Sequence, residues 1–495
     1  MNPSVVVTLE TGNVSGIVDG TTVRFSDIPY AAPPVGDLRF ASPQAPEPWS
    51  GIHQPTHPGA NAPQRLAEVP GLAIEPLIGA GWISGDDYLT LNVWSPIGEI
   101  QKLPVMVWIH GGGFVAGSKD APVSDGRTFA RDGIICVAIN YRMGIDGFLP
   151  IPGIPTNLGL RDMLAALRWV QDNIAAFGGD ADNVTVFGES AGAMAIADLL
   201  TSPLAKGLFR RAIVQSGHGA MVRDIPVALR LVRKLAQLLK IAPDRDGFGQ
   251  VDPDRGIDAI LKLARPGKVD LRDADGFEPV FGISRFIPVW GDDLLPQKPI
   301  EALRQGAGAE IDLLIGTNAE EMNLYFVPTG VKAKIWRLLA RWFVGKSMPR
   351  AGGLLRAYGM GQKGKRPGDA MTEALSDCVF RWPARQFAEA HQGRTHVYEF
   401  DWRSPAFAGE LGACHAMDVP FVFDTLATAT GANGLAGEDP PQALANHMHG
   451  LWVQFAKDGS LPWPKFDGET RQVYKIARRE TVSEPVMPCA QFLPA

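Results

Sequence analysis

The sequence predicts an α/β fold in which a large, mostly parallel sheet is flanked by helices. Three observations lead to this prediction. Short apolar segments of strand length recur along the chain, amphipathic segments separate some of them, and two apolar segments run into glycine-rich turns. Strands that alternate with helices are typical of parallel sheets, because parallel neighbours need a crossover connection.

The predicted strands begin at the N-terminus. The opening of the chain, from VVVTLE through TTVRFSDIP, predicts short strands joined by glycine-bearing turns. Residues 30–49 follow and are too rich in proline for a helix. The predicted buried strands come next, and their sequences are LTLNVW, PVMVWIH, IICVAIN, VTVF, AIVQSG, IDLLIG and HVYEF.

One helix stands out between the third and fourth of these strands. In residues 161–177 the apolar side chains recur at spacings of three and four, at Leu164, Leu167, Val170 and Ile174. This spacing places them on one face of a helix. Two glycines, at 178 and 179, predict its end.

Length and composition define the class of protein. The chain has 495 residues, of which 45% are hydrophobic and 20% are charged. Such a chain can bury a large core, which excludes a disulfide-built miniprotein, and its glycine and proline content is too low for collagen or a low-complexity chain. We find no internal repeat and no linker-like tract. We therefore expect one domain over residues 1–495, with a lid or rim insertion around 325–376.

Charge and cysteine usage limit the partners and the compartment. A net charge of −6 argues against general nucleic-acid binding. No apolar run reaches the roughly 18 residues that span a bilayer, so we expect no stable membrane insertion. We identify no export signal, because no Lys or Arg precedes Arg24. The cysteines are too sparse for a disulfide framework, and Cys136 is expected to be a buried thiol. We expect a cytoplasmic monomer or small homo-oligomer.

Residues 331–366 differ from the rest of the chain. They contain ten Lys or Arg residues and no Asp or Glu, interleaved with Trp336, Trp342 and Phe343. A basic amphipathic helix can mark a membrane surface or a site for an anionic ligand. The alternative is a solvated lid helix at the rim of a cleft, with its aromatic side chains turned inward. We favour the lid helix, because the rest of the chain is acidic.

The strongest local motif surrounds Ser190. The strand VTVF leads into Gly188-x-Ser190-x-Gly192, which is followed by the helical segment AMAIADLL. A sharp turn from strand to helix exposes the serine oxygen, and the flanking glycines avoid clashes with neighbouring backbone. The positive end of the helix also favours developing negative charge. Ser190 is therefore the candidate nucleophile.

A second motif follows the strand PVMVWIH. His110 is followed by three glycines and Phe114. Glycine allows backbone N–H groups to approach an oxyanion closely, and an HGGG loop is typical of lipases and esterases. A phosphate-binding loop is the alternative, but no Lys-Ser/Thr follows. We expect His110 to order the loop and Phe114 to line an apolar cleft.

A nucleophilic serine requires a base, and the base requires a carboxylate. In this architecture the acid lies between the serine and the histidine in sequence. His218 follows Ser190 too closely for that order and is a candidate pocket or structural residue. His415, in a glycine-bearing loop after HVYEF, is the better base. The remaining later histidines are His391, His396, His447 and His449.

The carboxylate is not determined by the pattern. Glu320 and Glu321 both follow the buried strand IDLLIG, and adjacent residues project in different directions, so only one of them can face His415. Asp418, three residues after His415, is a rival acid that lies outside the expected order.

Several motifs in order resemble the type B carboxylesterase family, which includes cholinesterases and bacterial para-nitrobenzyl esterases. The resemblance runs nearly end to end and implies an α/β-hydrolase fold. It assigns Ser190 as nucleophile, Glu321 as acid and His415 as base. It also assigns the oxyanion hole to Gly112, Gly113 and the N–H of Ala191. The motifs are FSDIPYAAPPVGDLRF, GDDYLTLNVW, IHGGGFVAGS, NLGLRDMLAALRWVQDNIAAFGGDADNVTVFGESAGA, GTNAEE and HAMDVPFVF.

The chain departs from the family pattern at three positions. Tyr88 and Ala62 stand where the family commonly has a pair of cysteines, so an early disulfide is absent, as expected in a reducing compartment. Met322 replaces the glycine that usually follows the acid. Some family members lack the catalytic serine or histidine and act in adhesion, whereas this chain retains both.

The resemblance implies a serine hydrolase that cleaves small to medium hydrophobic esters through an acyl-enzyme, with no metal or organic cofactor. One alternative is a hydrolase of carbamates, amides or thioesters that uses the same three residues. The other is a non-catalytic interaction protein on the same scaffold.

Overall fold

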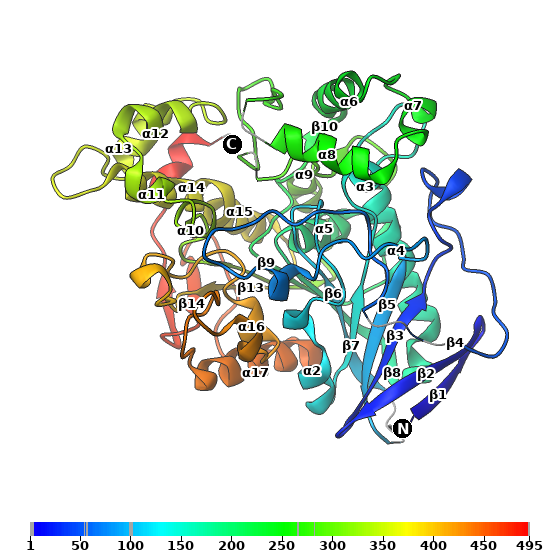
Figure 1. The fold of residues 1–495 in the computed structure, drawn as a ribbon. Coiled ribbons are helices and arrows are strands. Elements are labelled where there is room, and N and C mark those ends of the chain that lie inside the picture. Colours follow the sequence, from blue (N-terminus) through cyan, green and yellow to red (C-terminus); the bar gives the residue numbers. More distant parts are fainter. Residues whose placement is uncertain are drawn as a thin grey trace.

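A large twisted sheet runs through the whole molecule (Figure 1). The computed structural model describes residues 4–53, 55, 58–98, 102–264, 267–281 and 283–493. Within these ranges the sheet has the strand order β1-β2-β3-β5-β7-β6-β8-β9-β12-β13-β14-β15, and β4 pairs with β2. The strands are β1 (Ser4–Leu9), β2 (Gly12–Asp19), β3 (Thr22–Pro29), β4 (Ile52–His53), β5 (Thr90–Pro96), β6 (Leu103–Ile109), β7 (Ile135–Ile139), β8 (Gly179–Glu189), β9 (Arg211–Gln215), β12 (Asp312–Asn318), β13 (Thr395–Phe400), β14 (Gln472–Lys475) and β15 (Glu480–Ser483).

The middle of the sheet is parallel, as predicted. Strands β7, β6, β8, β9, β12, β13 and β14 run in one direction, and antiparallel strands occupy both ends. Gly188 in β8 lies opposite Ile109 in β6 and Val214 in β9. The carboxyl ends of β6, β8 and β9 therefore meet at one edge of the sheet, where open α/β sheets bind their ligands.

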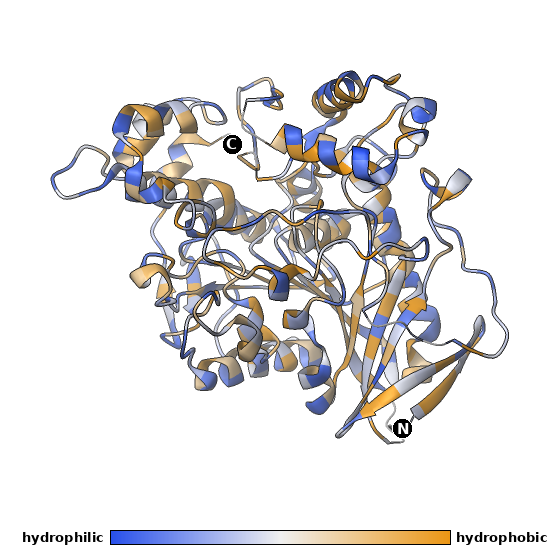
Figure 2. Cartoon of the chain, in the orientation of Figure 1, coloured by the Kyte–Doolittle hydropathy of each residue, from blue (hydrophilic) through white to orange (hydrophobic). Residues whose placement is uncertain are grey.

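Helices cover both faces of the sheet. Along β6, Val105 and Val107 belong to one hydrophobic cluster, and Met106 and Trp108 belong to another. Side chains alternate along a strand, so these clusters lie on opposite faces. Both faces are therefore buried, as is usual for a parallel sheet. Figure 2 shows the hydrophobic residues along the central strands.

The helices lie between the strands in sequence. Short strands β10 (Arg223–Asp224) and β11 (Val289–Trp290) form a separate pair. The helices are α1 (Glu75–Ile78), α2 (Arg127–Arg131), α3 (Gly144–Phe148), α4 (Leu158–Asn173), α5 (Ala191–Thr201), α6 (Ile225–Leu239), α7 (Arg245–Gly249), α8 (Pro253–Ala264), α9 (Pro299–Arg304), α10 (Asn323–Phe326), α11 (Val331–Lys334), α12 (Arg337–Val344), α13 (Ala351–Ala357), α14 (Pro367–Ser376), α15 (Trp382–Ala390), α16 (Val419–Val422) and α17 (Gln442–Asp458).

The predicted helix at 161–177 is confirmed. It begins slightly earlier, at Leu158, and its last turn, Ile174–Phe177, is a 3₁₀ helix. Gly178 ends it with a φ of 88°, in the left-handed region that glycine adopts without strain. All seven predicted buried strands are also present.

The predictions for the cysteines and for membrane-spanning segments can be compared with the structure. Cys136 is completely buried, and burial raises the pKa of its thiol well above the ordinary value. The cysteines, Cys136, Cys378, Cys414 and Cys489, are unpaired. Across the part of the chain that is described, no helix combines the length and the hydropathy needed to cross a bilayer.

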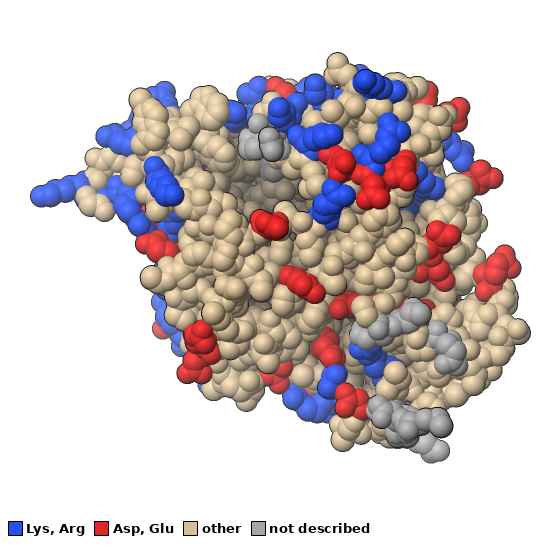
Figure 3. Space-filling view, viewed as in Figure 1, with Lys and Arg blue, Asp and Glu red and all other residues tan. Residues whose placement is uncertain are grey.

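Helices α10 to α14 cover residues 323–376 and contain the basic segment. Figure 3 shows Lys and Arg gathered over this part of the molecule, at the upper left. The prediction that its aromatic side chains turn inward is wrong for Trp336 and Trp342, which are each 58% exposed. Only Phe343 packs inward, against Phe281 and Phe326. The reason is that the inner face of α12 is already filled by the smaller Ala340 and Val344, which are fully buried.

Candidate active site

Ser190 lies at the turn between β8 and α5. It has φ 54° and ψ −119°, a conformation rarely adopted by a non-glycine residue. Its N–H donates to the carbonyl of Gln215 at 2.9 Å, which anchors the turn to β9. A Cβ on Gly188 or Gly192 would lie 2.6 or 1.9 Å from the carbonyl oxygen of Ile109. Glycine on both sides of the serine therefore allows β8 and α5 to pack against β6.

Ser190, His415 and Glu321 are in direct contact, although they come from distant parts of the chain. His415 Nε2 lies 2.8 Å from Ser190 Oγ. His415 Nδ1 lies 2.7 Å from Glu321 Oε2. All three are buried, with exposed fractions of 5% for Ser190, 4% for His415 and 0% for Glu321. The hydroxyl, the imidazole and the carboxylate form one continuous chain of hydrogen bonds.

The choice between the candidate acids follows from their contacts. Glu321 contacts the imidazole, whereas Glu320 pairs with Arg403 and accepts a hydrogen bond from Ala413 N–H at 3.0 Å. Asp418 instead accepts from Gln215 Nε2 at 2.8 Å and from Asn318 Nδ2 at 3.1 Å. Of the three carboxylates, Glu321 is the one bonded to His415.

The other oxygen of Glu321 is also fully engaged. Oε1 accepts from Ser216 Oγ at 2.6 Å and from the N–H of Asn318 at 2.7 Å. These hydrogen bonds hold the carboxylate in one orientation toward the imidazole. Met322, where the family commonly has glycine, has φ −76° and ψ −6°, which any residue can adopt. The departure from the family pattern therefore does not strain the turn.

Glu189 is a second carboxyl group beside the imidazole, and no sequence pattern singled it out. Its Oε1 lies 3.1 Å from His415 Nε2. Burial raises the pKa of Glu189 to about 8. Burial lowers the pKa of His415, but the carboxyl groups of Glu189 and Glu321 outweigh it and raise the pKa to about 9. An ionised Glu189 favours the protonated form of His415, so the pKa values of these two groups depend on each other.

The glycine loop after β6 lies next to Ser190. Gly112 and Gly113 have φ values of 104° and 64°. A Cβ on Gly112 would lie 2.0 Å from the carbonyl oxygen of Ala116, so this tight turn requires glycine. Ala191 is the first residue of α5, and its N–H has no partner inside the helix. These backbone N–H groups are the candidates for binding an oxyanion.

His110 and Phe114 both pack inside the protein. His110 stacks on Tyr141 with 4.4 Å between ring centroids, and its Nδ1 lies 2.9 Å from the carbonyl of Gly111. Burial lowers the pKa of His110 to about 4. Phe114 is fully buried and lies 4.2 Å from the ring of Phe148. Both side chains are buried and support the glycine loop through these ring contacts.

His218 is held by backbone groups at both ring nitrogens. Nε2 lies 2.7 Å from the carbonyl of Val379, and Nδ1 accepts from the N–H of Ala220 at 3.3 Å. Burial lowers the pKa of His218 to about 4. His396 is buried and packs edge-to-face against Trp463. The remaining late histidines bond elsewhere: His391 to Thr395, His447 to Tyr474 and His449 to Val422.

Two aromatic rings flank His415 and were not selected from the sequence. The ring of Phe380 lies 4.8 Å from the imidazole, and that of Tyr325 lies 5.7 Å away. Both come from the helical region 323–381, far from His415 in sequence. Tyr325 and Glu321 both follow β12 closely, which is a sequence signal for Tyr325, but sequence spacing does not define which side chains face the imidazole.

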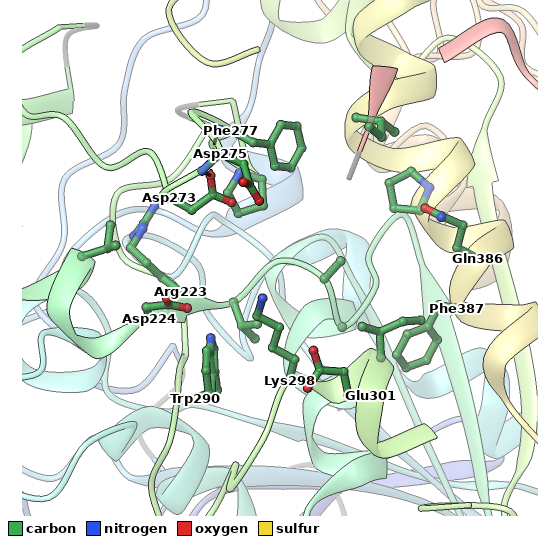
Figure 4. A pocket seen from close by; sticks show the side chains of 18 of the residues that line it. Arg223, Asp224, Asp273, Asp275, Phe277, Trp290, Lys298, Glu301, Gln386 and Phe387 are labelled. Carbon is green, nitrogen blue, oxygen red and sulfur yellow. Dashed lines mark hydrogen bonds between the residues drawn. The ribbon is translucent and has the colours of Figure 1, made fainter. Parts of the chain in front are cut away.

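A separate cavity of about 290 Å³ begins one residue after His218 (Figure 4). Gly219, Trp290, Lys298 and Phe387 are among the residues that line it. Asp273 and Asp275 lie on one wall, with Trp290 and Lys298 across from them. None of the three hydrogen-bonded residues lines this cavity. Among all the described residues, no group of three or more His, Cys, Asp or Glu is placed to hold a metal ion.

The sequence matches one protein family over almost its whole length. The family is described as the carboxylesterase family, and the match covers residues 3–488. A para-nitrobenzyl esterase of Bacillus subtilis is 35% identical, over 96% of each chain. A phenmedipham hydrolase of Pseudarthrobacter oxydans is 32% identical, over 94% of this chain and 93% of its own.

Solved structures of similar proteins share the fold. A PNB esterase superimposes with a TM-score of 0.83 at 32% identity, over 99% of both chains. A carboxylesterase of Geobacillus stearothermophilus superimposes with a TM-score of 0.81 at 32% identity, over 97% of this chain and 98% of its own. The predicted fold, with a large and mostly parallel sheet between helices, is confirmed.

Proposed function

The chain belongs to the carboxylesterase family and is a carboxylic ester hydrolase, and we propose that it acts through an acyl-enzyme formed on Ser190. One observation carries the proposal: the continuous hydrogen-bond chain from Glu321 through His415 to Ser190. A serine hydroxyl is a weak nucleophile by itself, and an imidazole in hydrogen-bond contact can remove its proton as it attacks.

In the first half of the reaction, Ser190 Oγ attacks the ester carbonyl carbon and its proton passes to His415 Nε2. Glu321 Oε2 accepts the hydrogen bond from His415 Nδ1, which holds the imidazole in the required tautomer and stabilises its charged form. The negative charge that develops on the carbonyl oxygen is stabilised by the N–H groups of Gly112, Gly113 and Ala191. The alcohol then leaves with the proton from Nε2.

In the second half, water takes the place of the alcohol. His415 removes a proton from the water, which attacks the acyl carbon, and the carboxylic acid leaves as Ser190 regains its proton. Each step moves one proton through Nε2, so no metal ion and no organic cofactor is required.

The substrates we propose are small to medium hydrophobic esters. Support comes from the rings of Phe380 and Tyr325 beside the imidazole, since aromatic side chains are typical of the walls of apolar ligand sites. Activity on matched esters of increasing chain length, compared with the corresponding carbamates and anilides, would define the class of bond.

An organophosphonate probe tests the nucleophile directly. The probe should label the protein once per chain, at Ser190, because only an activated serine reacts rapidly. The Ser190→Ala variant should not be labelled, and its kcat should fall at least about 10⁴-fold while its thermal unfolding stays close to that of the parent protein. Labelling at another serine, or full activity in the variant, would overturn the proposal and favour a non-catalytic scaffold or a different nucleophile.

We also propose that the protein works in the cytoplasm. Its cysteines are unpaired and buried, and Tyr88 and Ala62 stand where the family commonly has a pair of cysteines. Disulfides are rare in reducing compartments. Cell fractionation followed by probe labelling should recover the protein with cytoplasmic markers, and recovery with exported proteins would contradict this proposal.

A further inference from the structure

Helix α12 presents an apolar face to solvent. Trp336, Leu338, Leu339 and Trp342 are exposed by 58%, 65%, 40% and 58%. We call these four residues, together with the neighbouring cations Lys334, Arg337, Arg341 and Lys346, the α12 surface. Figure 2 shows the hydrophobic character of this outer helix.

The exposed face is separate from the face that packs α12 onto the protein. Ala340 and Val344 are fully buried, and Phe343 packs against Phe281 and Phe326. Leu338 and Trp342 are four residues apart and lie together on the outer side. Folding therefore does not require these two large side chains to be apolar. Monomeric proteins rarely expose such a group, and one that is exposed commonly marks an interaction site.

The charge around this apolar face has one sign. Lys332, Lys365 and Arg366 pair with acidic residues of α14 or with Glu410. The cations of the α12 surface have no carboxylate within salt-bridge distance among the residues described. The Lys346 ammonium lies over the Trp342 ring, 3.8 Å from its centroid, so cation and aromatic ring are adjacent on the same face.

A groove runs beside the same helix. It has a volume of about 310 Å³, and Phe326, Ile335, Leu339 and Phe343 are among its lining residues. Lys334 also lines it. The groove thus combines apolar walls with a cation, which matches a hydrocarbon chain attached to an anionic group.

We propose that the α12 surface docks the protein on an anionic lipid bilayer. Trp and Leu side chains insert at the boundary between headgroups and acyl chains, while the long Lys and Arg side chains reach the phosphate groups. Trp is favoured at this depth because its ring is apolar and its N–H can remain in a polar layer. The protein binds to the surface of the bilayer, and no helix crosses it.

A second copy of the chain fits this surface poorly. Self-association through the same face would bring the four cations of the α12 surface against four like charges. The apolar side chains project outward from a helix, which suits insertion into a fluid layer. An anionic lipid surface supplies both the negative charge and the apolar environment.

Ring contacts on the inner face of α12 connect this helix to the candidate active site. Phe343 of α12 lies 5.8 Å from Phe326, and Tyr325, the residue before it, lies 5.7 Å from the His415 ring. Docking would therefore hold the carboxyl edge of the sheet near the bilayer. This orientation serves catalysis only if the proposed function is correct, whereas docking does not depend on it.

Sedimentation with lipid vesicles tests the proposal on the full-length protein. The protein should bind vesicles that contain phosphatidylglycerol and phosphatidylcholine, and it should not bind vesicles of phosphatidylcholine alone. The double variant Leu338→Ser/Trp342→Ser should bind at least about tenfold more weakly. The triple variant Lys334→Gln/Arg337→Gln/Arg341→Gln should bind about a hundredfold more weakly, since each cation near an anionic surface contributes about fivefold.

Matched controls carry the same kinds of change elsewhere. Leu238→Ser/Val486→Ser removes two exposed apolar side chains outside the α12 surface. Arg168→Gln/Arg210→Gln/Arg233→Gln removes three exposed charges outside it. Both controls should bind as the parent protein does, and all variants should keep the parent's kcat/KM on a soluble ester. Absence of binding by the parent protein, equal binding to neutral vesicles, or retained binding in both α12 variants would overturn the proposal. So would a parent dimer that the double variant makes monomeric.

Discussion

The carboxylate of Glu321 is bonded on both oxygens, and this determines what its loss should do. Replacing Glu321 with Gln keeps the size of the side chain but removes the charge opposite the imidazole. The amide can also hold His415 in the wrong tautomer, so we expect kcat to fall about 10⁴-fold. Steady-state kinetics on a soluble ester would measure this effect.

Two neighbouring acids serve as controls for that variant. Glu320→Gln and Asp418→Asn remove carboxylates that bond to groups other than His415. Both variants should retain kcat to within about tenfold. If Asp418→Asn abolished activity while Glu321→Gln did not, the assignment of the acid would be wrong.

Glu189 should control the pH at which the imidazole becomes a base. An ionised Glu189 favours the protonated form of His415 and so contributes to its raised pKa of about 9. His415 can accept a proton from Ser190 only in its neutral form, so a raised pKa moves the acidic limb of kcat/KM to higher pH. In Glu189→Gln that limb should move to lower pH by about one unit.

A pH profile of kcat/KM for the parent and the Glu189→Gln variant would test this. A purely structural role for Glu189 would lower activity at all pH values without moving the limb. An unmoved limb would mean that Glu189 stays protonated throughout the titration of His415.

At the level of single residues, the sequence predicted what local patterns encode. Ser190 lies in a motif whose geometry is local, and His415 follows from the order of strands and loops. The pattern alone could not choose between Glu320 and Glu321, because that choice depends on how a loop meets another loop 94 residues away. Glu189 was missed for a related reason: its unusual pKa arises from burial, which depends on the complete fold.

The turn between β8 and α5 depends on close contact with β6. In Gly192→Ala the added Cβ would lie 1.9 Å from the carbonyl oxygen of Ile109. Either the strand or the helix must move, so we expect the free energy of unfolding to fall by about 1–3 kcal/mol and activity to fall with it. Chemical unfolding and ester hydrolysis would measure the two effects.

Gly450, within α17, is the matched control. Apart from its chain neighbours and the nearby backbone of α17, no heavy atom lies within 4 Å of a Cβ placed there. In Gly450→Ala the free energy of unfolding should rise by about 0.5–1 kcal/mol, because alanine loses less conformational entropy in a helix. A loss of stability in this variant equal to that of Gly192→Ala would show that contact with β6 is not the cause.

Elements were predictable where one face is clearly buried. The seven strands and α4 have apolar patterns that match their periods. Helix α12 has apolar residues on both sides, so its sequence does not reveal which side packs inward. The structure resolves this, because the small side chains at 340 and 344 fit the space beneath the helix and the tryptophans do not.

A buried ionic cluster connects the last three strands of the sheet to α15. Lys475 Nζ lies 2.7 Å from both Glu399 and Glu484, and Arg385 contacts Glu484 at 3.0 Å. Burial raises the pKa of Glu484, but Arg385 and Lys475 outweigh it and hold the pKa well below the ordinary value. A carboxyl group whose pKa is lowered by folding stabilises the protein above its ordinary pKa, and this contribution is lost as the pH falls.

We therefore expect Glu484→Gln to lower the free energy of unfolding by about 3–5 kcal/mol at neutral pH, because it removes one of the two carboxylates that neutralise the buried Lys475 and Arg385. The difference from the parent should shrink in acid, where the parent carboxylate also becomes protonated. Chemical unfolding at both pH values would show this. Glu373→Gln, which removes an exposed partner of Lys365, should change stability by less than about 1 kcal/mol.

At the scale of the molecule, the alternation of strands and helices predicted the parallel sheet but not its strand order. Strand β6 lies between β7 and β8, although β7 follows it in sequence. This order results from crossover connections over both faces, which local patterns do not record. The resemblance to a known family supplied the α/β-hydrolase fold that periodicity left open.

The wide spacing of Ser190, Glu321 and His415 has a consequence for synthesis of the protein. A polypeptide released by the ribosome before residue 415 would hold a serine without its base, however well its first strands had paired. Nascent and prematurely ended chains should therefore be inert toward cellular esters. With the proposed roles of Ser190 and His415, hydrolysis begins only after residue 415 has been synthesised and packed, which makes turnover a sensitive reporter of maturation.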